Sequence, residues 1–215
     1  MDDQRRQKII EAAFETFLRY GFRRTTMDDI AQQVGLSRPT LYLTFPNKEA
    51  IFRAVVETGQ DRMLTEISAG LPGQGSLASG LRYAFEIWVV QPEAMTARSP
   101  AAEELLNTPF DFAKDVFDDG ARRLGDLLAE LITAAVIDPA ALQPPAQARA
   151  RVLVAATRGC KTAARDADDL RQLVEDLVDM TVAGLPLRAE ETVPARGRDT
   201  DGTVRTQARG TGTDQ

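Results

Sequence analysis

Residues 25–48, TTMDDIAQQVGLSRPTLYLTFPNK, carry the densest set of helix-boundary signals in the chain. Thr26 can cap a helix, because its hydroxyl reaches the free N–H groups of the opening turn, and Asp29 three residues later completes a T-x-x-D capping box. The apolar residues that follow recur at helical spacing: Ile30, Ala31 and Val34. The pattern predicts a short amphipathic helix that begins just after Thr26.

A second short helix is predicted after a glycine turn. Gly35 tolerates the positive φ that such a turn requires. Ser37 can cap the second helix, and Pro39 falls in its first turn, where a missing N–H costs nothing. Pro46 and Asn47 end this helix, and Asn47 can also cap the next one. Leu41 and Phe45 are four residues apart and face inward, which leaves these side chains pointing elsewhere: Arg38, Thr40, Tyr42, Leu43 and Thr44.

Two helices joined by a glycine turn, with polar residues crowded at the start of the second, are typical of a helix-turn-helix. In that motif the second helix enters the major groove of DNA while the first lies across the backbone. The alternative is an αα-hairpin inside a helical bundle, which is the commoner origin of a two-helix pattern. Polar and aromatic side chains left outward on so short a segment favour the helix-turn-helix.

Residues 9–56 also resemble the DNA-binding domain of the TetR family of bacterial transcriptional repressors. Three blocks carry the resemblance: FLRYGF at 17–22, TTMDDIAQQVG at 25–35 and SRPTLYLTFPNKEAIF at 37–52. As a set over this length they are specific. One position departs from the family pattern, since many members have His directly before the phenylalanine, where this chain has Thr44.

The motif implies contacts with DNA rather than catalysis. Tyr42 and Lys48 are interpreted as phosphate ligands, and Thr26 adds a hydroxyl at a helix N-terminus. Arg38 could donate two hydrogen bonds to a guanine, while the other residues at the base edges could contact thymine methyl groups. A half-buried core tyrosine and a solvated lysine at a helix start are the alternatives for Tyr42 and Lys48. The predicted DNA-binding set is Thr26, Ser37, Arg38, Pro39, Thr40, Tyr42, Leu43, Thr44 and Lys48.

Composition excludes several other classes of protein. The chain of 215 residues has no histidine, which removes the commonest general base and zinc ligand, so we expect no catalytic residue, no metal and no cofactor. A single cysteine, Cys160, rules out a disulfide framework within one chain and fits a reducing cytoplasm. No apolar run of about 18 residues is present, so no membrane span is expected. The opening residues MDDQRRQK do not have the pattern of a secretion signal.

The net charge of −6 is unevenly distributed. Residues 1–60 contain nine Lys and Arg against eight Asp and Glu, a net +1, and the remainder carries −7. Because phosphate binding depends on local charge, this distribution permits a DNA-binding surface in the first 60 residues. It does not by itself predict one.

The rest of the chain is predicted to be helical, giving an all-α protein with an N-terminal three-helix helix-turn-helix domain and a C-terminal helical bundle. We place the first domain at 1–47, the bundle at 48–186 and a disordered tail at 187–215, because the tail has few large apolar residues. A tail that binds DNA is the alternative. The first helix is predicted over 5–20. A later helix is predicted over 76–91, and Pro92 is expected to end it. The other predicted helices cover 48–68, 93–107, 111–136, 146–165 and 168–184.

The family resemblance further implies a small-molecule pocket in the bundle. The scarcity of buried charge there favours an apolar effector. The candidate lining residues are Met63, Phe85, Trp88, Met95, Phe110, Phe112 and Phe117. Aromatic and Met residues at helical spacing are more often plain core.

The same resemblance implies a homodimer formed by the last two helices, although these could instead close an intramolecular bundle. Two recognition helices roughly 34 Å apart would read a palindromic operator in double-stranded DNA. The predicted interface consists of Ala156, Cys160, Ala163, Leu170, Leu173, Val174, Leu177, Val178 and Thr181.

Three functions therefore stand open. The first is a repressor released from its operator by a ligand, and the second is a DNA-binding protein of the same fold that needs no effector. The third is an all-α enzyme or carrier, for which the sequence offers no catalytic constellation.

Overall fold

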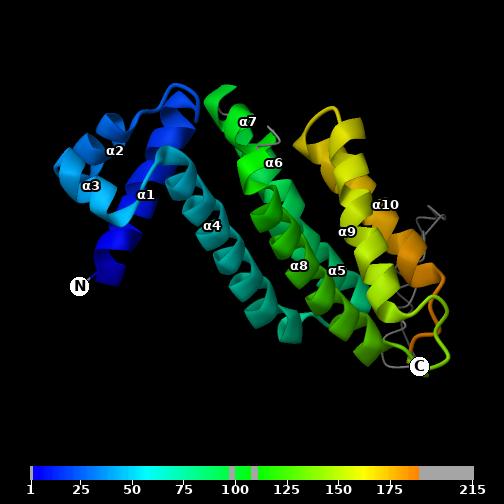
Figure 1. Ribbon diagram of the computed structural model, residues 1–215. Coiled ribbons are helices and arrows are strands. Elements are labelled where there is room, and N and C mark those ends of the chain that lie inside the picture. The colour runs from blue at the N-terminus through cyan, green and yellow to red at the C-terminus, as the bar shows by residue number, and fades with distance from the viewer. Residues whose placement is uncertain (1, 97–99, 108–110, 189–215) are drawn as a thin grey trace, which may run out of the picture.

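The computed structural model describes residues 2–96, 100–107 and 111–188 and shows helices arranged in two groups (Figure 1). The first three helices lie together at one end of the molecule. The long helix α4 (Lys48–Gly70) leads away from them toward the second group, which is a bundle. The prediction of an all-α fold is confirmed over the described residues, where the only extended pairing is one isolated bridge between Val136 and Leu187.

The N-terminal group consists of α1 (Asp2–Tyr20), α2 (Met27–Val34) and α3 (Arg38–Thr44), packed against the first half of α4. Its core is built around aromatic rings. Phe17, Phe22 and Phe52 contact one another with ring centroids 5.0–5.9 Å apart. The contacts of Phe52 with Phe17 and Phe22 are edge-to-face, which adds to the stabilisation that burial itself provides.

The predicted caps of α2, α3 and α4 are confirmed. Thr26 and Asp29 form a reciprocal capping box at the start of α2, and Gly35 ends that helix with φ of 72°. The Ser37 hydroxyl accepts a hydrogen bond from the Thr40 N–H at the start of α3. Asn47 caps α4 by accepting from the Ala50 N–H at 2.8 Å. Short helices of this length are marginal in isolation, so these caps and the aromatic core together fix the geometry of α2 and α3.

Helix α4 contributes to both hydrophobic cores. Ile51, Phe52 and Val55 are buried among the N-terminal helices. Leu64 and Ile67, farther along the same helix, are buried in the bundle core. One continuous helix therefore joins the two groups.

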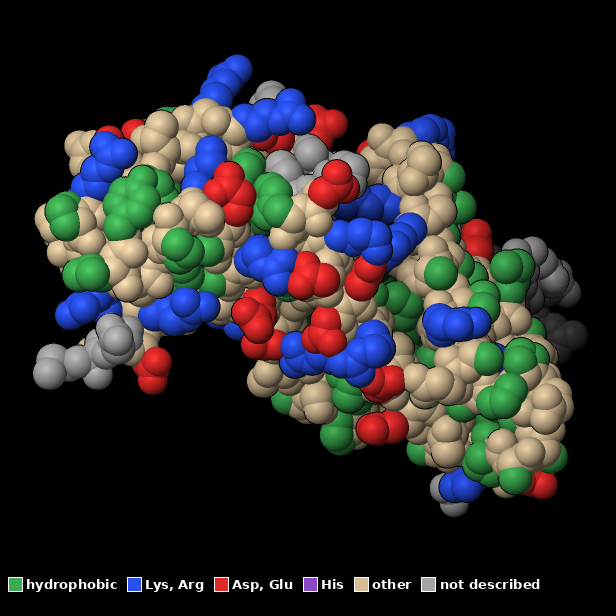
Figure 2. Space-filling model, in the orientation of Figure 1, with side chains coloured by type: hydrophobic (Ala, Val, Ile, Leu, Met, Phe, Trp, Pro, Cys, Tyr) green, Lys and Arg blue, Asp and Glu red, His purple; other side chains and the backbone are tan. Residues whose placement is uncertain are grey.

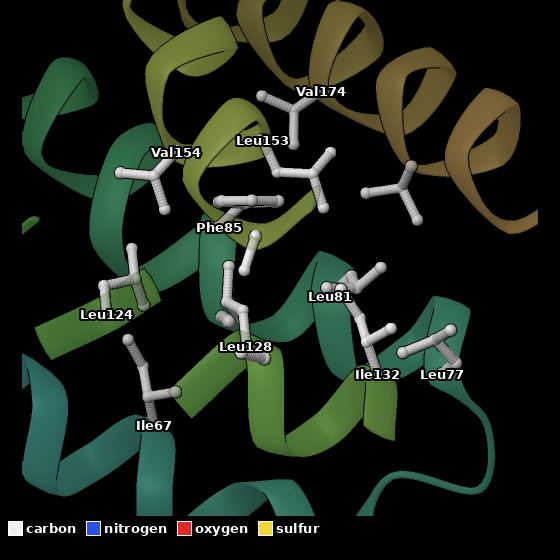
Figure 3. Close-up of a cluster of buried hydrophobic side chains, with 14 of the residues drawn as sticks. Ile67, Leu77, Leu81, Phe85, Leu124, Leu128, Ile132, Leu153, Val154 and Val174 are labelled. Atoms are coloured by element: carbon white, nitrogen blue, oxygen red, sulfur yellow. The ribbon is translucent and has the colours of Figure 1, made fainter. Parts of the chain in front are cut away.

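The bundle contains η1 (Leu71–Gly73), α5 (Leu77–Phe85), the π-helical segment η2 (Glu86–Val90), α6 (Gln91–Thr96), α7 (Pro100–Asn107), η3 (Asp111–Ala113), α8 (Lys114–Ala135), α9 (Ala146–Ala163) and α10 (Ala167–Ala183). Its core lies between α4, α5, α8, α9 and α10 (Figure 3). Phe85, Leu81, Leu124, Leu128 and Ile132 are fully buried there. Ion pairs such as Lys161–Glu93 and Arg171–Glu86 link its helices around this apolar core.

The prediction that Pro92 ends a helix is wrong. The chain passes from α5 through η2 into α6, and Pro92 is the second residue of α6. The Gln91 N–H bonds to the Glu86 carbonyl, five residues back, in place of the usual four. This wider turn relieves the clash that a proline ring makes with the preceding turn of an α-helix, so the helical path continues past it.

The chain remains ordered past the end of α10. The Ile137 N–H donates to the Pro186 carbonyl at 2.9 Å, and the Arg188 N–H donates to the Ala135 carbonyl at 3.0 Å. Leu187 and Arg188 thus belong to the packed structure, while residues 189–215 of the predicted tail lie outside the described residues. Among the described helices, none is long and apolar enough to cross a membrane.

Candidate functional site

Helix α3 has one buried face and one fully exposed face. Leu41 is completely buried and Phe45 is 2% exposed, which anchors the helix to the N-terminal core. Leu43 is 85% exposed and Tyr42 is 41% exposed, so large apolar side chains point into solvent from a helix that is otherwise firmly packed. Figure 2 shows hydrophobic and basic side chains together at this end of the molecule, over α2 and α3. Exposed apolar groups beside basic ones are typical of a surface that contacts a partner.

The first turn of α3 presents polar groups in fixed positions. The Ser37 and Thr40 hydroxyls are 2.7 Å apart, and Pro39 between them is exposed. Thr44 in the last turn is half-buried. The hydroxyl of Thr40 is therefore held by the cap rather than left free to rotate.

Arg38 is held by two neighbours. Its Nη1 donates to Asp28 Oδ2 at 3.1 Å, and its guanidinium carbon lies 5.6 Å from the centroid of the Tyr42 ring. A hydrogen bond with Tyr42 and the charge of Asp28 raise the pKa of Arg38 above its ordinary value. The Arg38 side chain thus lies between α2 and the second turn of α3.

The Thr26 hydroxyl is fully engaged in the capping box. It donates to Asp29 Oδ2 at 2.7 Å and accepts from the Asp29 N–H at 3.2 Å. Hydrogen bonds from the Thr26 hydroxyl and N–H lower the pKa of Asp29, which keeps the carboxylate charged. To donate to a phosphate, the hydroxyl of Thr26 would have to leave Asp29.

Lys48 is half-buried and turned toward the protein. Its Nζ donates to the Phe22 carbonyl at 2.8 Å and to the Thr25 carbonyl at 2.7 Å, and it lies 4.4 Å from the centroid of the Phe22 ring. Since an ammonium group has three N–H donors, one remains for a further acceptor. Lys48 thereby ties the start of α4 to the loop between α1 and α2, a contact that the sequence pattern did not predict.

The same loop also contacts the bundle. Glu104 Oε1 on α7 accepts from the Arg23 N–H at 3.1 Å. The ring of Phe112 lies 5.2 Å from that of Phe22. The loop between α1 and α2 therefore contacts α4 through Lys48 and the bundle through Glu104 and Phe112.

A third link joins α4 to α8. Arg53 Nη2 donates to Asp115 Oδ2 at 2.7 Å, and Arg53 Nη1 donates to the Phe112 carbonyl at 2.5 Å. The hydrogen bonds from Arg53 lower the pKa of Asp115 to about 2. The pair is exposed, so its contribution to stability is small, but it fixes the position of η3 against α4.

The predicted pocket residues do not converge on one cavity. Phe85 is fully buried in the bundle core, and Met63 and Trp88 pack against that core. Phe112 and Phe117 pack against the N-terminal core instead. Met95 is half-buried on α6, and Phe110 lies outside the described residues.

A hollow does occur elsewhere, as a groove of about 550 Å³ between α8 and α9. Its walls combine small residues with basic ones. The residues that line it are Asp118, Ala121, Arg122, Gly125, Pro145, Gln147, Ala148, Arg151, Val154, Ala155 and Arg158. None of them belongs to the predicted pocket.

The predicted dimer residues divide into two groups. Leu170, Val174 and Val178 are at most 3% exposed, because they pack inside the chain's own bundle. The others are half-buried or exposed: Ala156, Cys160, Ala163, Leu173, Leu177 and Thr181. Burial raises the pKa of the Cys160 thiol.

Two large apolar side chains missing from the predicted set stand out on the same helices. Val152 on α9 is 62% exposed and Met180 on α10 is 72% exposed. Met180 lies three residues from Leu177 and seven from Leu173, so the three share one face of α10. That spacing was visible in the sequence, but it did not reveal which edge of the apolar stripe faces outward.

Comparisons with known proteins agree with this geometry. The sequence model described as "Bacterial regulatory proteins, tetR family" matches residues 9–55, which cover α2 and α3 and the helices that support them. The HTH-type transcriptional regulator YfiR of Bacillus subtilis (strain 168) is 35% identical over 106 residues, or 49% of this chain and 52% of YfiR. The HTH-type transcriptional repressor ComR of Escherichia coli (strain K12) is 35% identical over 66 residues, 31% of each chain. The chain thus spans about half the length, or less, of these curated relatives.

The fold as a whole has relatives among solved structures. A transcriptional regulator from Cytophaga hutchinsonii ATCC 33406 superposes with a TM-score of 0.64 at 24% sequence identity. The superposition covers 83% of this chain and 96% of the other. At that identity the likeness establishes the fold alone.

Proposed function

Since this chain belongs to the TetR family of bacterial regulatory proteins, we propose that it is a homodimeric, sequence-specific DNA-binding regulator of transcription. The observation that carries the proposal is the exposed face of α3. Leu43 and Tyr42 project from a short helix whose opposite face is locked into the core by Leu41 and Phe45. A rigid helix that presents polar, basic and apolar groups to solvent has the form that enters a major groove. The proposal places the protein in the cytoplasm, with the DNA that it binds.

Arg38, Pro39, Thr40 and Leu43 are proposed to face base edges, while Tyr42 and the third N–H of Lys48 contact phosphates. Ser37, Thr44 and Thr26 complete the surface. Because the Thr26 hydroxyl is engaged by Asp29, its contribution to phosphate binding comes from the positive end of α2.

The homodimer is proposed to form through α9 and α10. Val152 lies on the exposed face of α9, and Met180 shares one face of α10 with the half-buried Leu173 and Leu177. Burying such side chains against a second copy removes apolar surface from water, which drives association. The buried Leu170, Val174 and Val178 support this face from beneath rather than forming part of it.

We further propose that the protein is a repressor and that a small molecule releases it from its operator. ComR, one of the relatives, is named as a repressor. The loop between α1 and α2 touches the bundle through Glu104 and Phe112, so a ligand that moved α7 or η3 would act on the helix-turn-helix. The effector is proposed to be small and largely apolar.

The test is selection of bound DNA from a pool of random duplexes by the purified full chain at near-physiological salt. We expect an inverted repeat whose half-sites lie about one helical turn apart. That result would also supply the operator needed to screen effectors for release.

Other outcomes point elsewhere. Salt-sensitive binding without sequence preference would replace a specific regulator with an architectural DNA-binding protein. No binding even at low salt would refute the proposed function, because phosphate contacts alone should retain DNA under those conditions.

A further inference from the structure

Beside the proposed DNA surface lies an acidic residue whose only local role in α2 is its place in the first turn, where a carboxylate favours the positive end of the helix. Asp28 is the second residue of α2 and is exposed. Its neighbour Asp29 completes the capping box with Thr26, but Asp28 takes no part in that cap. A carboxylate beside a phosphate-binding surface repels DNA, so its presence there calls for a separate explanation.

The contact with Arg38 supplies that explanation. Asp28 lies in the first turn of α2 and Arg38 is the first residue of α3, and the glycine turn brings these two helix starts together. Arg38 Nη1 donates to Asp28 Oδ2 at 3.1 Å, with each side chain 61% exposed. The bond to Asp28 uses one of the five N–H groups of the guanidinium.

Tyr42 bounds the same guanidinium from the next turn of α3. Its ring centroid lies 5.6 Å from the guanidinium carbon of Arg38. Asp28 and Tyr42 thereby restrict the Arg38 side chain from two sides. An arginine restrained in this way loses less conformational freedom when it forms a two-bond contact with guanine.

We propose that Asp28 is a positioning residue for base recognition, which orients Arg38 toward a guanine edge and discourages binding to DNA that lacks that guanine. The inference rests on the proposed function and adds a specificity-determining residue to it. In the free protein the exposed pair contributes little. When DNA is bound, it excludes water from around Asp28 and Arg38. The effective dielectric constant there falls, and the ion pair between the two side chains becomes stronger.

The experiment compares the full chain with Asp28→Ala and Asp28→Asn. Binding is measured to the selected operator, to operators with each single substitution at the guanine that Arg38 contacts, and to random duplex DNA, over a range of salt concentrations. Glu49→Gln is the matched control, because Glu49 also lies in the first turn of a helix of this group and makes no ion pair among the described residues.

Asp28→Ala is expected to lower discrimination at that one base pair by about two- to fivefold, the range that an exposed ion pair supports. Its affinity for random DNA should rise, because a negative charge has been removed from the surface. Glu49→Gln should leave discrimination unchanged. Asp28→Asn keeps the shape of the side chain and an acceptor oxygen, so its discrimination should fall between wild type and Asp28→Ala.

A double-mutant cycle separates positioning from general effects. In an Arg38→Ala background, Asp28→Ala should no longer change discrimination at this base pair, while it should still raise affinity for random DNA. Thermal melting of each variant shows whether the fold is kept. Should Asp28→Ala melt early, the same cycle is run with Asp28→Asn.

Two results would overturn the inference while leaving the proposed function intact. One is an operator-binding protein whose discrimination is unchanged by Asp28→Ala and Asp28→Asn. The other is an equal change in discrimination with and without Arg38. If the wild-type chain selects no defined site, the proposed function fails and this inference fails with it.

Discussion

Lys48 has a structural task at the junction of the loop between α1 and α2 with α4, and a proposed second task in binding DNA. Two of its N–H groups hold the Phe22 and Thr25 carbonyls, and the third is free to reach a phosphate. A lysine that merely extended into solvent would carry only the second task. The two tasks predict separate losses when the side chain is truncated.

For Lys48→Ala we expect the free energy of unfolding to fall by about 1–3 kcal/mol, because two backbone carbonyls lose a charged donor. We also expect operator and random DNA to be bound more weakly by the same factor, with the slope of log K against log salt reduced by about one unit. Urea unfolding and salt titrations measure the two effects.

Arg24→Ala is the control for Lys48→Ala, since Arg24 is an exposed basic residue of the same loop. It should leave the free energy of unfolding within about 0.5 kcal/mol of wild type. Equal stability of Lys48→Ala and Arg24→Ala would show that the carbonyl contacts contribute nothing.

Gly21 and Gly35 occupy similar backbone conformations in different surroundings. Their φ angles are 81° and 72°, but a Cβ at Gly21 would lie 2.5 Å from Glu104 Oε2, whereas a Cβ at Gly35 would meet nothing within 4 Å. Gly35→Ala should therefore cost only the left-handed backbone penalty, about 1–2 kcal/mol.

Gly21→Ala should cost about 1 kcal/mol more than Gly35→Ala, because Glu104 must also move. In a Glu104→Ala background, which already lacks the bond to the Arg23 N–H, Gly21→Ala should cost no more than Gly35→Ala costs in the wild-type chain, as measured by urea unfolding. If Gly21→Ala and Gly35→Ala lower the free energy of unfolding equally, the close approach of α7 to the loop does not affect stability.

Helices α4 and α8 pack closely against each other at a glycine. A Cβ at Gly120 would lie 2.4 Å from the buried Gln60 side chain, while Gly125, five residues along α8, has nothing within 4 Å of the same position. The two glycines thus form a natural pair for comparison in one helix.

Gly125→Ala should raise the free energy of unfolding by about 0.5–1 kcal/mol, since alanine favours the helix. Gly120→Ala should lower it by about 1–3 kcal/mol through overpacking against Gln60. Thermal melts of the two variants give the measurement. A gain in stability from Gly120→Ala would mean that Gln60 moves aside without cost.

The sequence predicted the helix-turn-helix to within a residue or two because its signals are local. The caps at Thr26, Ser37 and Asn47 and the turn at Gly35 each act over a few residues. The bundle was predicted less well. The pattern predicts that a helix ends at Pro92, but the π-helical turn before Pro92 lets the helix continue. A local pattern does not show such an adjustment.

Long-range contacts explain the remaining differences. Phe112 and Phe117 have the same spacing as core residues of the bundle, yet they pack against the N-terminal core, because η3 folds back on α4. In α10 the wide apolar stripe is divided, with Leu170 inside and Met180 outside. Periodicity gives the width of a stripe, and only the neighbouring helices determine which edge is covered.

At the scale of the whole molecule, the exposed apolar faces of α9 and α10 predict the oligomeric state. We expect Met180→Asp to shift the chain from dimer to monomer in sedimentation equilibrium, because a charge would be placed in the proposed apolar interface. Its affinity for a palindromic operator should fall much more than its affinity for a single half-site.

Ile137→Asp is the matched control for Met180→Asp. Ile137 is 64% exposed, close to the 72% of Met180, but it follows α8 and lies outside the proposed interface. It should stay dimeric. If Met180→Asp is as dimeric as Ile137→Asp, the two copies associate through a different face.

Because α4 is buried at one end in each of the two hydrophobic cores, a change in its tilt would move the N-terminal group relative to the bundle. Its 23 residues make a rod about 35 Å long. A tilt of about 5° at the bundle end displaces the end at Lys48 by about 3 Å, close to the rise of one base pair along DNA. If α3 enters a major groove as proposed, a tilt of this size would therefore move it by about one base step.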